Sequence, residues 1–497
     1  MTAAQGPRTY GGWRRRRPVG LLGLGPAGTV TLLAAVVGVL STFSVAPKAA
    51  LFIAPPVLAG CGISLARVGG VPVATAAAIR VRWWLAVSRD WTSYRAGITA
   101  AGPGAYQLPG VLAATMLVSA EDGRGGRYGL VWDRHTGHLT ATIKVTPSSP
   151  WLADPETADT WVGGWAAWLA SLGYQPSVSW VSVTVETAPE PGTRLQDQVA
   201  ASCSPDAPQA ARDIMTAVAA ATPQAAASTA VRVSVTFDPK ADPLRPQTLT
   251  AAAASCTRTL HGLIPGLGAC GVAVDGLATP AEIAGMVRSA FDPASRGEVT
   301  RLLDAARRSP SADPPLTWTD AGPAGAREMS DRYAHDSGIS VSWAWSEAPR
   351  QAVTSAVLAR LAAPAAYAKR LTMQYRALPA AAAARAIESE VNAAQFRATY
   401  RNKTGRDATA RDHYDSSRAA QAAAEEATGA GVVLLGLYVT VTVTDADSLA
   451  AAASMTEAAA EASRIRLRRM YFAQAAGFAA SLPCGVCPPQ IAGRGPR

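Results

Sequence analysis

Three different functions are compatible with the stretch RTYGGWRRRRPVGLLGLGPAG, residues 8–28. This stretch combines a basic cluster that suits nucleic acid, a twin-arginine pattern that suits export, and the GxGxxG spacing of a phosphate-binding loop. A dinucleotide loop also needs a preceding strand and an acidic residue about 20 positions later. No strand pattern precedes Gly23, and the first acidic residue of the chain is Asp90. The glycine spacing therefore does not predict a nucleotide site.

A second motif, HDSG at residues 335–338, places histidine, aspartate and serine side by side, the residue types of a catalytic triad. Adjacent residues of an extended chain point to opposite faces, so these side chains cannot form a relay. We expect a turn before the strand ISVSWAW instead. The chain also lacks the GxxxxGKS/T, GxSxG and HExxH patterns of ATPases, hydrolases and metalloproteases. We therefore predict no catalytic residue and no enzymatic activity.

Histidine and cysteine residues are too scattered to predict a metal site. His135 and His138 lie close together, but no cysteine or carboxylate cluster lies near them in the sequence. The CGVC motif at residues 484–487 is a lone CxxC without a second pair at zinc spacing. We predict no metal and no cofactor.

An alternating basic pattern marks RIRLRRM near the end of the chain. Arg464, Arg466 and Arg468 would share one face of a strand, with Ile465 and Leu467 on the other. Such arginines most often form a solvated sheet face. A patch that binds phosphate or an acidic partner is the alternative, and both interpretations stay open.

Two long uncharged runs stand out in the N-terminal part. Residues 20–45 and 49–66 contain no charged residue, and at about 1.5 Å per residue each approaches the ~30 Å thickness of a bilayer core. Both runs are longer than the apolar region of roughly 7–15 residues in a cleaved export signal. We predict a transmembrane helical hairpin over residues 20–66.

The distribution of charge supports this hairpin. Residues 1–96 hold eleven Lys and Arg residues but one acidic residue, so the whole formal net charge of +10 lies around the two runs. The positive-inside rule then predicts a multi-pass protein of the plasma (inner) membrane with both termini in the cytoplasm. A nucleic-acid-binding protein would carry its basic excess on the folded domain, so we expect no direct contact with nucleic acid. The residues expected to fix the topology or contact membrane lipid are Trp13, Arg14, Arg15, Arg16, Arg17, Arg80, Arg82, Trp83 and Trp84.

The remaining chain alternates strand and helix patterns. Residues 127–145 read as a β-hairpin around a His-Thr-Gly turn, and Trp161, Trp165 and Trp168 recur on one helical face, which indicates core packing. Thr279 and Glu282 have the spacing of a capping box. Residues 432–444 alternate valine and threonine, as a strand with two different faces does. The order of elements predicts an α+β class with mixed α/β, ferredoxin-like modules in the cytoplasm after the hairpin.

These observations predict seven segments along the chain. They are a basic cytoplasmic N-terminus (1–19), the transmembrane hairpin (20–66), a basic aromatic juxtamembrane segment (67–96), a first cytoplasmic α/β domain (97–306), a linker (307–316), a second cytoplasmic α/β domain (317–483) and a tail (484–497).

Three segments together resemble a known family. They are RTYGGWRRRRPVGLLGLGPAGT with the two uncharged runs, DAGPAGAREMSDRYAHDSGISVSWAWSEAPR, and the closing GAGVVLLGLYVTVTVTDADSL with YFAQAAGFAASLP. They look like the PrgI-type membrane proteins of actinobacteria that are associated with type IV secretion. The second half is similar to the non-catalytic N-terminal domain of conjugative secretion ATPases. In those ATPases a run like GFAASLP precedes the motor domain, whereas here fourteen residues follow it.

The resemblance implies a function without catalysis. It implies a non-catalytic inner-membrane scaffold of a type IV secretion-like or conjugative transfer apparatus. Its partners would be a conjugation-type ATPase, other secretion subunits and further copies of the chain in a homo-oligomer. The alternative is a type VII secretion membrane component of the EccE kind, which also has two N-terminal spans. Neither function transfers a catalytic residue to this sequence.

Overall fold

The structure is a computed structural model of the whole chain. It describes residues 8–11, 13, 25–45, 48, 52, 54–57, 60, 66–68, 71–97, 107–148, 153–189, 199–200, 202–204, 206–221, 227–309, 314–347, 349, 351–403, 417, 420–425 and 429–492. The chain divides into two compact units, one of residues 13–93 and one of residues 1–12 and 94–497.

The smaller unit consists of short elements. Its described elements are α1 (Gly25–Val45), the antiparallel pair β1 (Arg67–Val68) and β2 (Val71–Pro72), and α3 (Val73–Ser88). In the part of the chain that the structure describes, no helix is both long enough and apolar enough to cross a membrane. The predictions of a transmembrane hairpin and of a multi-pass membrane location are therefore wrong.

Of the predicted hairpin over residues 20–66, the structure describes α1 and residues 48, 52, 54–57, 60 and 66, and the other positions lie outside the described residues. The helix α1 contains glycine and hydroxyl residues, and Ser44 Oγ donates a hydrogen bond to the carbonyl oxygen of Leu40 at 3.0 Å. The second uncharged run leads directly into the β1–β2 pair, where Arg67 pairs with Pro72. A search for segments without charged residues detects neither the hydroxyl groups of α1 nor the β1–β2 pair.

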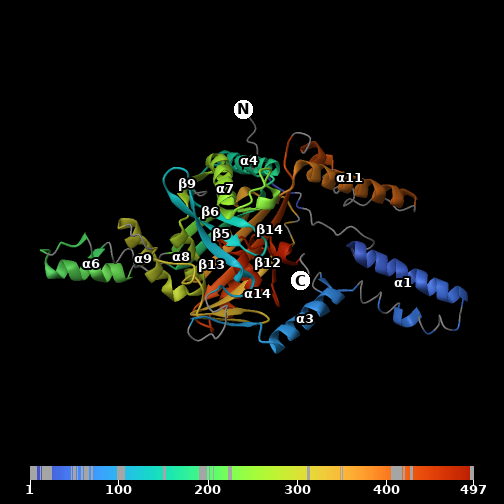
Figure 1. The fold of residues 1–497 in the computed structure, drawn as a ribbon, viewed down its shortest axis with the longest axis horizontal. Coiled ribbons are helices and arrows are strands. Elements are labelled where there is room, and N and C mark those ends of the chain that lie inside the picture. The colour runs from blue at the N-terminus through green and yellow to red at the C-terminus, as the bar shows by residue number, and fades with distance from the viewer. Residues whose placement is uncertain are drawn as a thin grey trace. The chain divides into compact units, whose positions relative to one another are not determined.

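The larger unit is built on one antiparallel sheet of thirteen strands (Figure 1). The strand order is β3-β10-β11-β12-β14-β13-β7-β8-β6-β5-β4, with β15 added to β12 and β9 added to β6. The strands are β3 (Ser93–Arg95), β4 (Thr115–Glu121), β5 (Arg127–Asp133), β6 (Leu139–Pro147), β7 (Val178–Pro189), β8 (Ala227–Phe237), β9 (Val272–Leu277), β10 (Gly325–Glu328), β11 (Tyr333–His335), β12 (Gly338–Glu347), β13 (Ala368–Ala377), β14 (Val433–Val443) and β15 (Arg466–Arg469).

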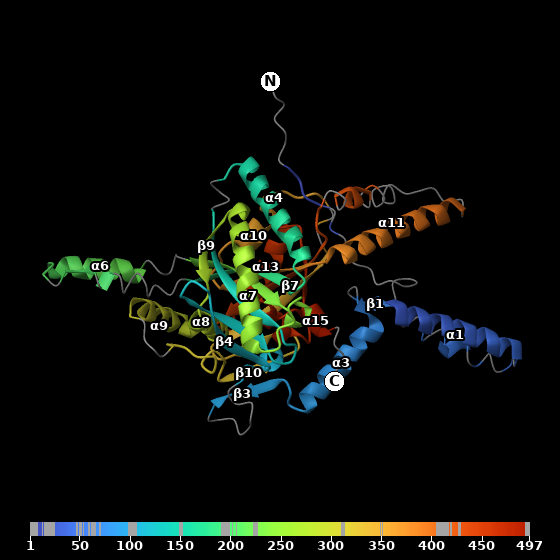
Figure 2. The ribbon, with the colours of Figure 1, turned by 45° about the horizontal axis from the view of Figure 1, so that its top comes forward.

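Helices connect these strands. The α-helices are α4 (Pro155–Ser171), α6 (Gln209–Ala221), α7 (Leu249–Leu263), α8 (Pro280–Phe291), α9 (Arg296–Arg308), α10 (Ala359–Ala362), α11 (Ala380–Lys403), α13 (Leu449–Ala462), α14 (Gln474–Ala480) and α15 (Pro488–Ala492), and the 3-10 helices include η7 (Ile264–Cys270). Figure 1 and Figure 2 both show α4 close to α7. Leucine residues of α7 pack in the core that contains Leu130 of β5, whereas Phe478 of α14 packs in the core that contains Val131, the next residue, which points to the opposite face of the sheet. Helices therefore cover both faces of the sheet.

The order of elements occurs twice along the chain. The first copy runs β4-β5-β6-α4-β7-α6-β8-α7-β9-α8, and the second runs β10-β11-β12-α10-β13-α11-β14-α13-β15-α14. Within each copy the strands neighbour one another identically: β9-β6-β8-β7 in the first and β15-β12-β14-β13 in the second. Each copy is thus a βαβαβαβ unit preceded by two strands and followed by a helix, and we call them module 1 and module 2. No repeat at residue level predicts this duplication.

The two modules share one sheet because β7 pairs with β13, its own counterpart. The predicted fold class is therefore wrong in a second respect: the modules are not successive bodies after a membrane hairpin but two halves of a continuous antiparallel sheet. Both sides of the predicted linker at 307–316, of which residues 310–313 lie outside the described part, belong to the same compact unit.

Several local predictions are confirmed. The hairpin at residues 127–145 is β5 and β6, and the HDSG motif forms the turn between β11 and β12. The capping box is present, with Thr279 Oγ1 accepting from Glu282 N and Glu282 Oε2 accepting from Thr279 N. Trp165 and Trp168 stack at 5.0 Å and pack against the core of module 1.

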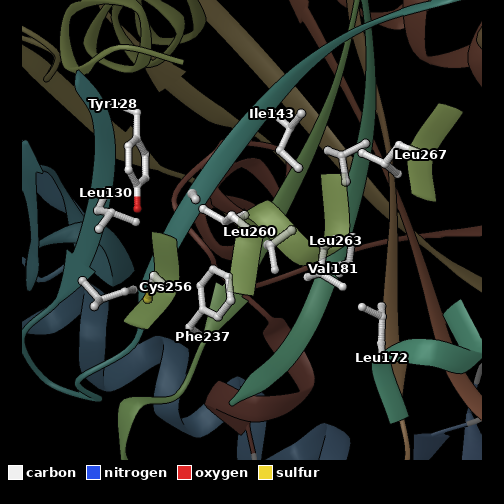
Figure 3. Close-up of a cluster of buried hydrophobic side chains, with 14 of the residues drawn as sticks. Tyr128, Leu130, Ile143, Leu172, Val181, Phe237, Cys256, Leu260, Leu263 and Leu267 are labelled. Carbon is white, nitrogen blue, oxygen red and sulfur yellow. The ribbon is translucent and has the colours of Figure 1, made fainter. Parts of the chain in front are cut away.

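The apolar face of the sheet forms the core of each module. In module 1, Val181 and Phe237 on the strands meet Leu260 and Leu263 on α7 (Figure 3). In module 2, the valines of β14 face α13, as the alternation predicts. Burial of such side chains contributes roughly 1.5–3 kcal/mol each.

The opposite face of the sheet is polar, yet it is buried as well. Pairs of hydroxyl groups cross from strand to strand at equivalent places in the two modules, each pair within hydrogen-bond distance: Thr140 with Thr236 (3.0 Å), Thr142 with Ser234 (3.0 Å), Ser340 with Thr442 (2.8 Å) and Ser342 with Thr440 (3.0 Å). Buried hydroxyl groups are tolerated when they are paired in this way. The Val/Thr alternation of β14 therefore separates two buried faces, not a buried face from a solvated one.

The C-terminal segment covers this polar face. Gly485 has a left-handed φ of 65°, and a Cβ there would overlap Thr140 Oγ1. The carbonyl oxygen of Val486 accepts from Gln374 Nε2 at 2.6 Å, and the side chain of Cys484 is 3% exposed. Residues 481–487, which we call the C-terminal strap, therefore contact both modules and belong to the fold, although the sequence suggested a tail from residue 484.

Two adjacent glycines of α4 give a matched test of the packing between α4 and η7. A Cβ at Gly164 would overlap the backbone carbonyl of Ala269, whereas a Cβ at Gly163 would meet nothing within 4 Å. Gly164→Ala should lower the free energy of unfolding by about 1–3 kcal/mol, and Gly163→Ala should leave it unchanged or raise it by up to about 1 kcal/mol. Urea denaturation measures both values, and equal values would contradict this packing.

Candidate functional site

The centre of the sheet is the seam between the two modules. In the β7–β13 register Thr184 pairs with Thr372, and their hydroxyl oxygens are 3.0 Å apart. Next to this pair, Glu186 of module 1 lies opposite Arg370 of module 2. The most densely charged buried cluster that the structure describes begins at this point.

The cluster consists of one carboxylate and three guanidinium groups, and we call it the seam cluster. Glu186 Oε2 is 2.8 Å from Arg232 Nη1, and its Oε1 is 2.5 Å from Arg296 Nη2. Arg370 donates from Nε to Ser481 Oγ at 3.0 Å. Its guanidinium carbon also lies 4.9 Å from the ring centroid of Phe478. Glu186, Arg232 and Arg370 are 7%, 3% and 1% exposed.

The electrostatics of this cluster favour a charged carboxylate. Burial alone would raise the pKa of Glu186, but Arg296, Arg232 and Arg370 hold it well below the usual range. Burial lowers the pKa of Arg370 to about 10, against the opposing effect of Glu186. All four side chains are committed to one another or to the C-terminal strap, because Arg232 Nη2 also donates to the carbonyl oxygen of Ser481 at 3.0 Å. The seam cluster is therefore a joint between module 1, module 2, α9 and the strap.

A chain of hydrogen bonds extends from this joint to His335. Its Nδ1 lies 2.6 Å from the carbonyl oxygen of Phe291, and its Nε2 lies 2.8 Å from Ser340 Oγ. Because a carbonyl only accepts, Nδ1 carries the proton and Nε2 accepts from Ser340. Ser340 in turn accepts from Thr442 Oγ1 at 2.8 Å, the group to which Arg370 donates at 3.4 Å. Burial lowers the pKa of His335 to about 4, so this imidazole is neutral at pH 7.

The described surface has an open cleft beside the β5–β6 turn. It has a volume of about 450 Å³ and lies at the start of α7, where Thr248 Oγ1 caps the helix by accepting from Ala251 N at 3.2 Å. The described residues that line it include two cations and no acid: Trp132, Gly137, Leu139, Pro239, Lys240, Arg245, Pro246, Gln247, Thr248, Leu249 and Ala252.

The carboxylates nearest to the cleft hold loop backbone. Asp133 accepts from His135 N at 2.9 Å, Asp238 accepts from Lys240 N at 3.0 Å, and Asp242 accepts from Leu244 N at 2.8 Å. Among the described residues, Lys240 Nζ donates only to the carbonyl oxygen of Thr136, at 3.4 Å. The lining of the cleft therefore carries two cations, while the nearby carboxylates are engaged by their own loops.

The connection that carries the two cations of the cleft is much shorter in the described part of module 2. In module 1 the connection from β8 to α7 spans residues 238–248 and carries both cations, whereas in module 2 the corresponding connection from β14 to α13 spans only residues 444–448. That shorter connection contains two acidic residues, Asp445 and Asp447. The long connection beside the cleft is thus an addition to one copy of the module.

The predicted arginine patch is only partly on a strand. Arg464 precedes β15 in a left-handed conformation with φ 56°, and its Nη1 donates to Gln351 Oε1 at 3.1 Å. Arg466 and Arg468 lie exposed on β15, which pairs with β12 along one edge. The two exposed arginines share a face, as the alternation predicts, and Ile465 is buried in the core of module 2.

The residues predicted to contact membrane lipid belong to the smaller unit. Arg80, Arg82, Trp83 and Trp84 lie on α3, where Trp84 is 68% exposed. Trp13 is 42% exposed, and Arg14, Arg15, Arg16 and Arg17 lie outside the described residues. Just before them, Tyr10 is anchored in the larger unit, since its hydroxyl donates to Asp159 Oδ1 at 2.7 Å.

The described residues contain no clear metal-binding site. They contain no group of three or more His, Cys, Asp or Glu side chains placed to hold a metal ion. Cys484 and Cys487 are free thiols buried under the sheet, and burial raises the pKa of Cys484 to about 12. His138 packs edge-on against Trp180 with ring centroids 5.1 Å apart.

In comparisons with known proteins, no family model matches the chain and no curated protein matches it. The assignment of the site therefore depends on the geometry above. Sequence reasoning missed the seam cluster, although Glu186, Arg232 and Arg370 each stand inside an apolar strand pattern, where a charge needs a partner. It also missed the cleft, whose signal was the Pro- and charge-containing connection before α7.

Replacing Glu186 tests the seam cluster. Glu186→Gln leaves the buried guanidinium groups of Arg232 and Arg370, and the partly buried one of Arg296, without an anion, so we expect the free energy of unfolding to fall by roughly 3–5 kcal/mol. Glu388→Gln on the exposed face of α11 is the control and should change it by less than about 0.5 kcal/mol. The folded-state pKa of Glu186 lies below its unfolded value of about 4.3. Its contribution is therefore complete above that pH and is lost as pH falls. Urea denaturation from pH 7 to pH 3 checks both effects, and equal losses in the two variants would rule out the joint.

His335 should give the free energy of unfolding a second pH dependence, separate from that of Glu186. Its folded-state pKa of about 4 lies below the unfolded value of about 6.5, so its contribution is complete above pH 6.5 and is lost as pH falls toward 4. The loss should be on the order of 2–3 kcal/mol in the wild-type protein and should be absent in His335→Gln. The same pH series measures this slope, and a wild-type slope that persists in the variant would refute the assignment.

Proposed function

We propose that this chain is a non-catalytic docking scaffold of a type IV secretion-like or conjugative transfer apparatus. Its partners are a conjugation-type ATPase and other secretion subunits. The observation that carries the docking role is the division of the charged side chains into two groups. Those of the seam cluster bind one another inside the fold, whereas Lys240, Arg245, Arg466 and Arg468 are exposed.

The buried polar groups favour a rigid body over a reactive centre. Hydrogen bonds engage both nitrogens of His335, and Glu186 is bound by two arginines. A general acid or base must reach a substrate, and these groups instead reach from one module to the other. A body locked in this way presents its surface loops in fixed positions, which is what a scaffold requires.

The resemblance of residues 317–483 to the N-terminal domain of secretion ATPases supports the choice of apparatus. In that resemblance the GFAASLP run is a shared element, and in this chain it is α14 with the start of the C-terminal strap. Phe478 and Leu482 of this run are buried in the core below the sheet. The proposal includes no direct binding of nucleic acid, because residues 97–497 carry no net charge.

Affinity purification tests this proposal. The tagged full-length chain is expressed in its own host, purified from a whole-cell extract, and the co-purifying proteins are identified by mass spectrometry. We expect a conjugation-type ATPase among them, absent from a purification of the tag alone. Recovery of type VII secretion components, or of no specific partner, would refute the assignment to a type IV-like apparatus.

A further inference from the structure

We propose that the cleft beside the β5–β6 turn binds an acidic peptide segment of a partner protein, one that also carries an apolar side chain. This inference rests on the proposed docking function and assigns its recognition site. The observations that carry it are the two cations of the cleft, Lys240 and Arg245, and its apolar floor of Trp132 and Leu249.

The cations determine the charge of the ligand. Lys240 and Arg245 are exposed residues on the same rim, and none of the described residues that line the cleft is acidic. The nearby carboxylates Asp238 and Asp242 each accept a backbone N–H of their own loop. A carboxylate that enters the cleft therefore meets two cations, and charge-assisted hydrogen bonds of this kind are stronger than neutral ones.

The floor determines the second property of the ligand. Trp132 and Leu249 are partly buried, and both pack against the apolar core of module 1. A lone phosphate or sulfate would leave this apolar surface unused. A nucleic acid would need cations along several phosphates, and the cleft offers two. A peptide with one apolar side chain next to carboxylates uses both the floor and the rim.

Comparison of the two modules shows that the fold does not require the cleft. Trp132 lies on β5, and at the corresponding position of β11 module 2 has Ala334, as the strand pairings show. The connection that carries Lys240 and Arg245 is long in module 1 and short in module 2, although β8–α7 and β14–α13 have the same place in the topology. Module 2 folds without the indole, the cations and the added residues. Folding therefore does not require these features, and they are free to serve binding.

A peptide-binding experiment tests the site. The probe is an array of octapeptides that combine two or three Asp or Glu residues with one Leu, Phe or Trp, printed beside matched peptides with Asn and Gln in place of the acids. Purified full-length protein should bind the acidic set in preference to the amide set. The strongest acidic peptide, labelled with fluorescein, then gives dissociation constants by fluorescence anisotropy.

Charge variants identify the cleft as the binding site. Lys240→Gln with Arg245→Gln should weaken binding of the labelled peptide roughly tenfold or more. The control pair Arg308→Gln with Arg360→Gln removes the same charge from exposed positions outside the cleft and should leave the dissociation constant within about twofold. Trp132→Leu should also weaken binding, and circular dichroism confirms that each variant is folded. Equal binding of acidic and amide peptides, equal loss in both charge pairs, or competition of the labelled peptide by millimolar inorganic phosphate alone would overturn the inference.

The affinity purification separates this inference from the proposed function. If the wild-type chain and the Lys240/Arg245 variant recover the ATPase equally, the docking function stands and the cleft is not its site. If the acidic peptides bind in the cleft but the wild-type chain recovers no ATPase, the site stands and the proposed apparatus is wrong. Loss of the ATPase in the variant alone supports both.

Discussion

The pairing of β7 with β13 is the interaction on which the rest of the structure depends. It joins two copies of one module into a single antiparallel sheet, with Thr184 opposite Thr372 at the middle of the seam. Both faces of this sheet are buried, and the second face carries hydroxyl and charged side chains. The hydroxyl pairs satisfy one another across neighbouring strands, and the C-terminal strap supplies carbonyl acceptors to Arg232 and Gln374. The seam is therefore stable only together with these partners.

The charged side chains at the seam are not distributed equally between the two modules. Three guanidinium groups surround the single carboxylate of Glu186, and burial makes each of these charges costly unless the others are present. The charged groups of the cluster all have their partners only when module 1, module 2 and α9 are folded together. Such a cluster contributes more to the specificity of the pairing than to its net free energy, because apolar replacements of buried ion pairs are often equally stable. In a register shifted by two residues, Glu186 would lie opposite Ala368 or Thr372 instead of Arg370.

Comparison of the two modules distinguishes the features that the fold requires from those that occur in one module. The hydroxyl pairs, the crossing helices α7 and α13 and the added strands β9 and β15 occur in both modules, so they belong to the fold. The long connection at residues 238–248 and the indole of Trp132 occur in module 1 alone. A rigid two-module body with one modified copy fits a scaffold, in which the binding surface varies while the framework is retained.

The sequence by itself determined the local elements. The β5–β6 hairpin, the capping box at Thr279, the tryptophan face of α4 and the Val/Thr alternation of β14 follow from periods of two or 3.6 residues, which neighbouring residues set among themselves. The uncharged N-terminal runs led to a wrong prediction, since no helix of the described residues is both long enough and apolar enough to cross a membrane. Only the tertiary structure decided the duplication, the seam cluster and the cleft. Thr184 and Thr372 are 188 positions apart, and a contact at that separation depends on how whole modules pair, which no local pattern encodes.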